Sequence, residues 1–325
     1  MALPPVLKSL RLPVIGAPMF IAGNPQLVIE QCKAGIVGSF PALNARPADQ
    51  LDVWIKRIKK ELAEYQAANP DKKVAPFAVN QIAHGTNDRL EHDMQVCVDN
   101  QVPIIITSLM APKALIDAAH SYGGIVLHDA TNMRHARKAL NEGVDGLILV
   151  CAGAGGHAGT LSPFALLSEV RAIYDGTIAL SGAIANGRSV LAAQAMGADL
   201  AYVGTRFIAT HEANAEPEYK QMLVNASGED IVYSSLFTGI PGNYLKSSIA
   251  AAGLDPDNLP SADKSTMDFG SGGNTIAKAW RDIWGAGQGT GSIATVPSVA
   301  DTVAQLHREY RAAVAEITAK YGSFA

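Results

Sequence analysis

The sequence predicts an α/β protein whose main body is a (β/α)8 TIM barrel, with a smaller, mainly helical cap domain inserted after strand eight. Eight short runs rich in Val, Ile and Leu are each followed by a helical pattern through the first two thirds of the chain. The runs are almost continuously apolar, as is typical of parallel strands covered on both faces, and eight such units close into a barrel. An open doubly wound sheet also alternates strands and helices, but it seldom needs eight regular units.

The individual elements follow from the spacing of apolar residues. An apolar stripe at helical spacing indicates a helix between the second and third strands, formed by Leu51, Trp54, Ile55, Ile58, Leu62 and Tyr65. The predicted strands are residues 13–20, 35–40, 74–80, 102–109, 124–130, 144–150, 177–183 and 200–207.

Three segments are predicted along the chain: residues 1–213 form the barrel, residues 214–295 a cap that shapes the substrate site, and residues 296–325 a C-terminal helix that returns to the barrel. The alternation of strand and helix stops after Phe207. The cap carries a Gly-Ile-Pro-Gly turn at residues 239–242 and glycine-rich stretches at residues 270–273 and 285–291. The last segment has an apolar stripe suited to packing on the barrel, made of Val303, Leu306, Tyr310, Val314 and Ile317.

Composition excludes several classes of protein. The 26 Lys and Arg residues against 30 Asp and Glu residues give a formal net charge of -4, so no excess positive charge is available to bind nucleic acid or anionic lipid. Cys32, Cys97 and Cys151 form no C-x-x-C pair, which argues against disulfides and a metal site and favours a cytoplasmic location. Glycines, a histidine and a proline interrupt the longest uncharged run, residues 146–167, so no membrane segment is predicted.

A phosphate cradle is predicted where strands seven and eight end, because barrels commonly hold phosphate in the loops at these positions. Strand seven ends at Ser181, Gly182 and Ala183, and strand eight ends at Gly204 and Thr205, each just before an expected helix start. Glycine lets an anion approach backbone N–H groups, and a helix N-terminus adds the positive end of its dipole. The alternative is that these glycines only turn strand into helix.

The loop after strand six, residues 151–159, is rich in glycine and carries His157. At Gly155 and Gly156 the backbone could lie against a planar cofactor, while an imidazole of ordinary pKa suits a general base. A solvent-facing loop histidine is the alternative. The loop also reads as a loose G-x-G-x-x-A dinucleotide motif, which is disfavoured because it would begin a nucleotide-binding unit at strand six of eight.

Other strand ends supply further candidates. Asn80 could hydrogen-bond a heterocycle or cap the following turn, and Cys151 is expected to be a small buried hydrophobe. Tyr233, Tyr244 and Lys246 are candidates from the cap. The remaining strand ends carry Ala17, Pro18 and Met19 after strand one, Ser108 after strand four, and His128 with Asp129 after strand five.

Several of these motifs together resemble the nitronate monooxygenase family, formerly called 2-nitropropane dioxygenases. The likeness runs in order from about residue 13 to residue 213 and reappears in the Ala-Gly-Gln at residues 286–288. The motifs that carry it are APM at residues 17–19, Asn80, GAGGHAG at residues 153–159, LSGAIANGRS at residues 180–189 and MGADLAYVGTRFIATHEA at residues 196–213.

The resemblance implies an FMN-dependent barrel with a helical cap. His157 matches the family histidine thought to deprotonate a nitroalkane or to orient a nitronate beside the flavin. The implied reaction is oxidation of an alkyl nitronate by FMN with O2 as cosubstrate, which gives a carbonyl compound and nitrite. Gly182, Gly204 and Thr205 would hold the flavin phosphate, and the implied cofactor-binding set as a whole is Ala17, Pro18, Met19, Asn80, Ser108, Gly155, Gly156, Ser181, Gly182, Gly204 and Thr205.

Two departures from the family pattern bear on the substrate. Gly153 stands where many members have the acidic residue of EAGGH, and Asp129 stands where some reductase relatives have a basic residue. The family is also similar to FMN-dependent enoyl-acyl carrier protein reductases and NADH:quinone reductases, so an NAD(P)H-dependent reductase is the alternative, although Asp129 counts against it. A phosphate-ligand isomerase and a flavin-binding protein without turnover are non-redox alternatives. Barrels of this size often pair, so a homodimer is a candidate assembly.

Overall fold

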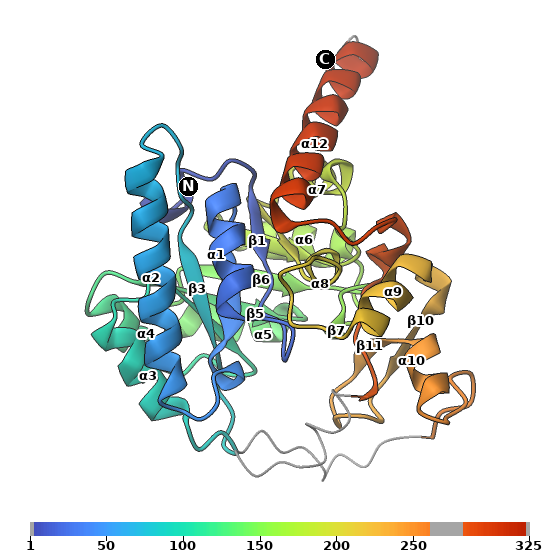
Figure 1. The fold of residues 1–325 in the computed structure, drawn as a ribbon, viewed down its shortest axis with the longest axis horizontal. Helices are drawn as coiled ribbons and strands as arrows, with labels where there is room; N and C mark the ends of the chain where they lie inside the picture. The colour runs from blue at the N-terminus through green and yellow to red at the C-terminus, as the bar shows by residue number, and fades with distance from the viewer. Residues whose placement is uncertain (1–2, 261–281, 323–325) are drawn as a thin grey trace.

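The computed structural model describes residues 3–260 and 282–322 of the chain. Eight parallel strands form one sheet in the order β1-β9-β8-β6-β5-β4-β3-β2, and a bridge between Ile15 and Val37 joins its two edges. The predicted (β/α)8 barrel is therefore confirmed (Figure 1). Its strands are β1 Val14–Gly16, β2 Gly38–Pro41, β3 Phe77–Ile82, β4 Ile104–Ser108, β5 Ile125–Ala130, β6 Gly146–Val150, β8 Thr177–Ser181 and β9 Leu200–Val203.

The ends of several strands differ from the prediction. β8 stops at Ser181 rather than residue 183, and β9 stops at Val203 rather than residue 207, because Thr205–Ile208 form a short helix. β1 stops at Gly16 rather than residue 20, because Pro18 cannot donate a ladder hydrogen bond and the chain turns away. A Cβ at Gly16 would lie 2.3 Å from Nε2 of the buried Gln31 side chain, so the glycine leaves room for this amide from the following helix. β3 continues to Ile82, which places Asn80 inside the strand rather than after it.

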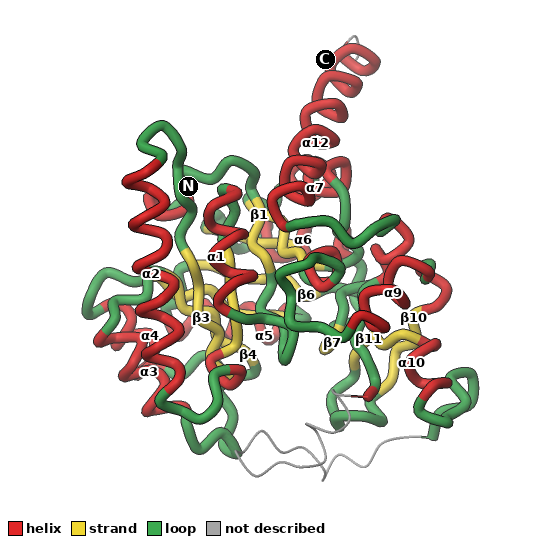
Figure 2. The backbone as a smooth tube through the Cα atoms, in the orientation of Figure 1, coloured by secondary structure: helices red, strands yellow, loops and turns green. Residues whose placement is uncertain are grey.

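Helices follow the strands around the outside of the barrel, and Figure 2 shows them enclosing the yellow strands. Asparagine side chains cap three of them: Asn24, Asn132 and Asn186 each accept a hydrogen bond from a backbone N–H in the first turn. The barrel helices are α1 Pro25–Ala34, α2 Gln50–Ala68, α3 Leu90–Asp99, α4 Lys113–His120, α5 Met133–Glu142, α6 Pro163–Arg171, α7 Gly187–Ala195 and α8 Thr205–Ile208.

The core has two layers because successive residues of a strand point to opposite faces. In β4, Ile104 and Ile106 belong to the cluster inside the barrel, whereas Ile105 belongs to the cluster between the sheet and the helices. Leu127 and Ile148 also belong to the inner cluster. Apolar side chains therefore fill the barrel, and polar groups are left to gather at the C-terminal ends of the strands.

The chain after β9 forms a second, smaller sheet that the sequence did not predict. Strands β10 (Ile231–Ser234) and β11 (Gly242–Leu245) pair antiparallel, and β11 also pairs with β7 (Gly156–His157) from the glycine loop. The described helical pieces of this region are α9 Pro217–Asn225, η3 Gly228–Asp230, α10 Lys246–Ala251 and η5 Gln288–Ser292. The predicted glycine-rich stretch at residues 270–273 lies outside the described residues.

The last helix, α12 (Val299–Tyr321), is buried against the barrel as far as Ala313. Val303 and Leu306 are buried against α1 and α7, as the apolar stripe predicts. Val314 and Ile317 are instead 38% and 41% exposed, because the helix continues beyond the barrel (Figure 1). The prediction that these two side chains also pack on the barrel is wrong.

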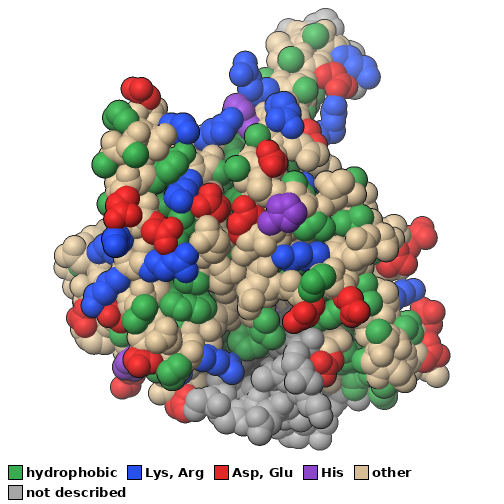
Figure 3. All heavy atoms as spheres, viewed as in Figure 1, with side chains coloured by type: hydrophobic (Ala, Val, Ile, Leu, Met, Phe, Trp, Pro, Cys, Tyr) green, Lys and Arg blue, Asp and Glu red, His purple; other side chains and the backbone are tan. Residues whose placement is uncertain are grey.

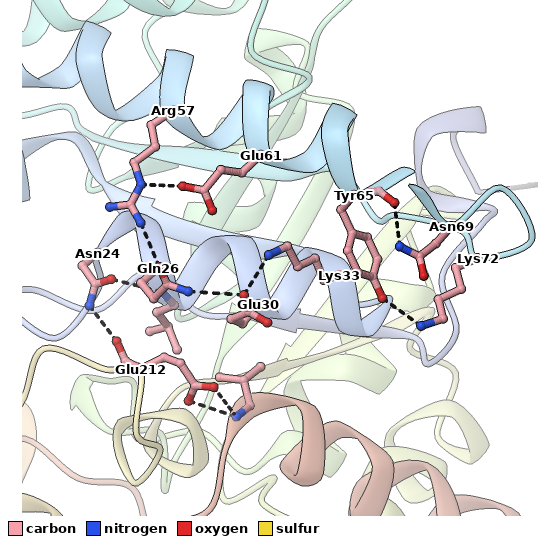
Figure 4. Close-up of polar contacts among 12 residues, drawn as sticks. Asn24, Gln26, Glu30, Lys33, Arg57, Glu61, Tyr65, Asn69, Lys72 and Glu212 are labelled. Carbon is pink, nitrogen blue, oxygen red and sulfur yellow. Dashed lines mark hydrogen bonds and ion pairs between the residues drawn. The ribbon is translucent and has the colours of Figure 1, made fainter. Parts of the chain in front are cut away.

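Polar side chains connect α1 to the start of α12. Asn24 accepts the Leu27 N–H at 3.0 Å, and its amide donates to the Glu212 carbonyl oxygen at 2.8 Å (Figure 4). Both carboxylate oxygens of Glu212 accept the N–H of Val299, the first residue of α12, at 3.0 Å. These hydrogen bonds hold the segment that follows β9 against the start of α1 and the start of α12.

The surface carries charges of both signs. On the face shown in Figure 3, Lys and Arg side chains are interspersed with Asp and Glu side chains over α2. Exposed pairs such as Lys56 with Asp52 and Arg57 with Glu61 lie four residues apart on this helix. In the part of the chain that the structure describes, no helix is long and apolar enough to cross a membrane.

Candidate active site

Polar side chains from three neighbouring strands form a hydrogen-bonded chain at the mouth of the barrel. The Asn80 amide on β3 donates to Oγ of Ser108 at 2.8 Å and to the Ile106 carbonyl oxygen at 3.2 Å. Oγ of Ser108 on β4 donates in turn to Oδ2 of Asp129 on β5 at 2.6 Å. Parallel register brings these residues to the same end of the barrel. Asn80 therefore bonds within the barrel mouth and does not cap the next turn.

Asp129 is an unusual member of this chain because only one of its carboxylate oxygens is bonded. Oδ1 is buried and has no hydrogen-bond partner among the described residues. Burial raises the pKa of Asp129 to about 6, and the bond from Ser108 partly opposes that rise. Burial holds the pKa of the Tyr202 phenol, on β9, well above its usual value, and the charge of Asp129 adds to this rise.

His157 lies on β7, where its backbone pairs with Gly242 of β11. Its Nε2 is 2.9 Å from Oγ1 of Thr238, whose hydroxyl also donates to the Ile240 carbonyl oxygen at 3.0 Å. Burial lowers the pKa of His157 to about 4, so the imidazole is neutral at pH 7. The side chain is partly buried and bonded, which rules out the solvent-facing alternative.

The backbone angles and the packing of the loop around His157 also require glycine. Gly153 and Gly156 have φ of +83° and +67°, which favour glycine. A Cβ at Gly155 would lie 2.7 Å from the backbone nitrogen of Gly287 and 2.8 Å from Oγ1 of Thr205. The loop therefore needs small residues because a second glycine-rich segment packs directly against it.

The ends of β8 and β9 meet the same two loops. Oγ1 of Thr205 accepts the Gly287 N–H at 2.9 Å. Gly182 has φ of +135°, and a Cβ there would lie 2.7 Å from the Ala152 carbonyl oxygen. The helix after β8, α7, begins only at Gly187, and the Gly187 N–H donates to a Glu309 carboxylate oxygen. The expected helix start directly after Ala183 is therefore wrong, whereas α8 does begin directly at Thr205.

The end of β1 adjoins the end of β9. The Ala17 N–H donates to the Val203 carbonyl oxygen at 2.9 Å. A Cβ at Gly204 would lie 3.5 Å from the Ala17 Cβ and 3.7 Å from Sδ of Met19, which is ordinary contact. Pro18, between them in sequence, is partly exposed. The structure thus brings the β1 and β9 parts of the predicted cofactor set together.

The cap candidates separate into two groups. The Tyr233 hydroxyl donates to the Ala158 carbonyl oxygen at 2.8 Å, and the Tyr244 hydroxyl is 3.5 Å from Oγ1 of Thr238, so both lie beside His157. Lys246 instead pairs with Asp257 at 2.8 Å, away from this cluster. Ser181 and Cys151 are buried at the ends of β8 and β6, and the thiol is a small buried group as predicted.

The structure also contains a cavity of about 450 Å³. It is lined by residues that follow β1 and β2 together with two later side chains: Phe20, Ile21, Gly23, Asn24, Leu43, Asn44, Arg46, Trp54 and Asn214. None of the hydrogen-bonded side chains at the barrel mouth lines it. The hydrogen-bonded groups described above therefore lie outside the lining of this cavity.

Sequence reasoning missed one residue of the site and left another without a role. Thr238 gave no signal, because its contact with His157 exists only after β7 pairs with β11. Asp129 did give a signal, since an acidic residue at the end of an apolar strand is unusual. Its importance appears only with the unbonded Oδ1.

Comparison with known proteins gives a consistent result. The sequence model of the family described as nitronate monooxygenase matches residues 7–309. The chain is similar to a nitronate monooxygenase from Paraburkholderia phytofirmans, with 26% identity over 94% of each chain. A nitronate monooxygenase from Neurospora crassa is 25% identical over 94% of this chain and 91% of its own.

Solved structures show the same fold. A nitroalkane oxidase from Streptomyces ansochromogenes matches with a TM-score of 0.81 and 24% identity, covering 96% of this chain and 99% of its own. FabK from Thermotoga maritima matches with a TM-score of 0.75 and 22% identity, covering 97% of each chain. At these identities the likeness concerns the fold alone.

Proposed function

The chain belongs to the nitronate monooxygenase family, and from this premise we propose that it is an FMN-dependent oxidoreductase that converts alkyl nitronates and O2 into carbonyl compounds and nitrite. The observation that carries the proposal is the position of His157, a neutral and partly buried imidazole held by Thr238 beside the mouth of the barrel. A neutral imidazole at that place can hold or accept a proton during nitronate oxidation.

The residues at the mouth fit a flavin. The unbonded Oδ1 of Asp129, with the Asn80 and Ser108 side chains beside it, offers polar contacts to the edge of a heterocycle. Of the predicted set, Gly182, Gly204 and Thr205 would hold the phosphate, and Ala17, Pro18, Met19, Asn80, Ser108, Gly155, Gly156 and Ser181 would surround the rest of the cofactor. Bound FMN would supply the electron-accepting chemistry.

Thr238 holds the Nε2 side of the His157 ring. The Thr238 hydroxyl has one hydrogen and donates it to the Ile240 carbonyl oxygen. Its oxygen also lies 2.9 Å from Nε2 of His157. This contact is proposed to orient the imidazole beside the bound substrate.

The low pKa of His157 bears on the choice of substrate. A base whose conjugate acid has a pKa of about 4 removes a proton from a neutral nitroalkane poorly at pH 7. A nitronate has already lost that proton and needs only to be held and kept away from water. Nitronates are therefore the proposed substrates, with neutral nitroalkanes as weak ones.

The test is oxygen consumption and nitrite release by FMN-loaded protein given an alkyl nitronate. We expect His157→Asn to lower kcat by about 100-fold or more while FMN still binds. His211→Asn removes an exposed histidine and should leave the rate unchanged. Full activity of His157→Asn on both nitronate and nitroalkane would contradict the proposed role.

An NAD(P)H-dependent flavin reductase is the second candidate function. The fold is similar to that of FabK, and fold alone does not distinguish a nitronate-oxidising enzyme from a reductase. Asp129 disfavours this candidate, because it stands where some reductase relatives have a basic residue. Rapid anaerobic bleaching of the flavin by NADH or NADPH would establish the reductase.

A further inference from the structure

The barrel mouth contains a carboxylate that the protein itself does not neutralise. Oδ2 of Asp129 accepts one hydrogen bond, from Ser108, and the buried Oδ1 accepts none from the described residues. No described Lys or Arg is among the groups that shift the pKa of Asp129. A buried carboxylate oxygen without a hydrogen bond lowers the free energy of unfolding. A ligand that donates a hydrogen bond to this oxygen would remove that cost.

The side chains that surround Asp129 come from three other strands of the barrel, β4, β6 and β9. Ser108 on β4 occupies Oδ2, and Tyr202 on β9 is the titratable group that faces the carboxylate across the barrel. Ile148 on β6, the strand partner of Asp129, belongs to the apolar core below. His128, the preceding residue, is on the opposite face and bonds Thr107. Among the described residues none bonds Oδ1, and this oxygen is shielded from solvent.

We propose that Asp129 contacts the flavin: Oδ1 accepts the N3–H of the isoalloxazine ring, and the negative charge of Asp129 lowers the reduction potential of the bound FMN. The ring carbonyls and the other ring nitrogens of oxidised flavin are acceptors, so N3–H is the one ring donor that a carboxylate can use. Asn80 and Ser108, in the same hydrogen-bonded chain, position the carboxylate. This inference rests on the proposed function, because it requires FMN in the barrel mouth.

The contact is tested by comparing the Kd of FMN with the Kd of N3-methyl-FMN, which lacks the N3–H. The wild-type protein should bind FMN roughly tenfold or more tightly than the methylated analogue, as expected when a buried acceptor is left unpaired. Asp129→Ala should bind the two equally, whereas Asp117→Asn, which removes an exposed carboxylate on α4, should keep the wild-type ratio. A preference that survives in Asp129→Ala overturns the contact.

The charge effect is tested by the affinities for reduced and oxidised FMN at pH 8. Asp129→Asn should favour reduced FMN by about tenfold, or about 30 mV for a two-electron couple. The difference should vanish at low pH, where Asp129 is protonated. Ser108→Ala retains the carboxylate but removes the bond that lowers its pKa, so the midpoint of this pH dependence should move upward. An unchanged potential in Asp129→Asn, or an unmoved midpoint in Ser108→Ala, overturns the charge effect.

These experiments distinguish failure of the proposed function from failure of the Asp129 contact alone. Wild-type protein that binds neither FMN nor its methylated analogue refutes the proposed function itself. Wild-type protein that binds FMN normally, with equal affinity for both flavins, leaves the proposed function standing and removes only the role of Asp129.

Discussion

The Nε2 atom of His157 lies 2.9 Å from Oγ1 of Thr238, and this contact joins the glycine loop after β6 to the segment between β10 and β11. Two parts of the chain far apart in sequence therefore meet at the proposed catalytic group. The hydroxyl of Thr238 is held by the Ile240 carbonyl oxygen, so its orientation is set before any substrate binds.

Replacing Thr238 tests this relationship. Thr238→Val keeps the shape of the side chain but removes the hydroxyl bonded to Nε2, so kcat for a nitronate should fall about 10-fold to 100-fold. Because Thr238 acts through His157, the Kd of FMN should change little. Thr238→Ser restores the hydroxyl and should recover most of the rate. Equal kcat in Thr238→Val and wild type would show that the contact does not position the imidazole.

The ionisation of His157 predicts a preference between two forms of the same substrate. Its pKa of about 4 leaves the ring neutral from pH 6 to pH 9, so kcat/KM for a nitronate should show no step from His157 in that range. At one pH, kcat/KM for the neutral nitroalkane should be at least about 100-fold lower. Comparable values for both forms, with a step near pH 7, would indicate a stronger base than this structure contains.

Asp129 should make the protein less stable without its ligand. Its folded pKa of about 6 exceeds the usual 3.8, so the folded state binds more protons than the unfolded state between these values. Its contribution to stability is present below pH 3.8 and is lost as the pH rises through 6. Asp129→Asn should therefore stabilise the ligand-free protein at pH 8 by up to about 3 kcal/mol, measured by urea unfolding. No gain at pH 8, or an equal gain at pH 4, would contradict an uncompensated carboxylate.

The close packing of the two glycine segments predicts a sharp difference between two Gly→Ala variants. A Cβ at Gly155 would lie 2.7 Å from the Gly287 nitrogen, whereas a Cβ at Gly85 meets nothing within 4 Å. Gly155→Ala should lose roughly 1–3 kcal/mol of stability and weaken FMN binding, because the loop must move. Gly85→Ala is the matched control and should unfold like wild type. Similar melting temperatures for both variants would show that the loops do not constrain each other.

The sequence predicted the barrel well because buried parallel strands are continuous apolar runs, such as residues 146–150, which form β6. It could not predict β7, because the two residues Gly156 and His157 carry no strand pattern and become a strand only by pairing with β11. The stripe on α12 failed at Val314 and Ile317 for a related reason, since periodicity gives a helical face but not where its partner ends.

The site was predictable to a similar degree. Strand ends identified Asn80, Ser108 and His157, because a barrel concentrates its chemistry there. The bond from Ser108 to Asp129 and the bond between His157 and Thr238 depend on register and on a sheet formed after the barrel, which no local pattern encodes. Whether the predicted cofactor set binds FMN stays a prediction.

The most direct measurement is anaerobic stopped-flow spectroscopy of FMN-loaded protein mixed separately with an alkyl nitronate, NADH and NADPH. A nitronate oxidase predicts that the nitronate alone reduces the flavin rapidly, and that His157→Asn slows this reduction by about 100-fold or more. Fast reduction by a nicotinamide nucleotide, with the nitronate inert, would contradict that function and assign the chain to the reductases of the same fold.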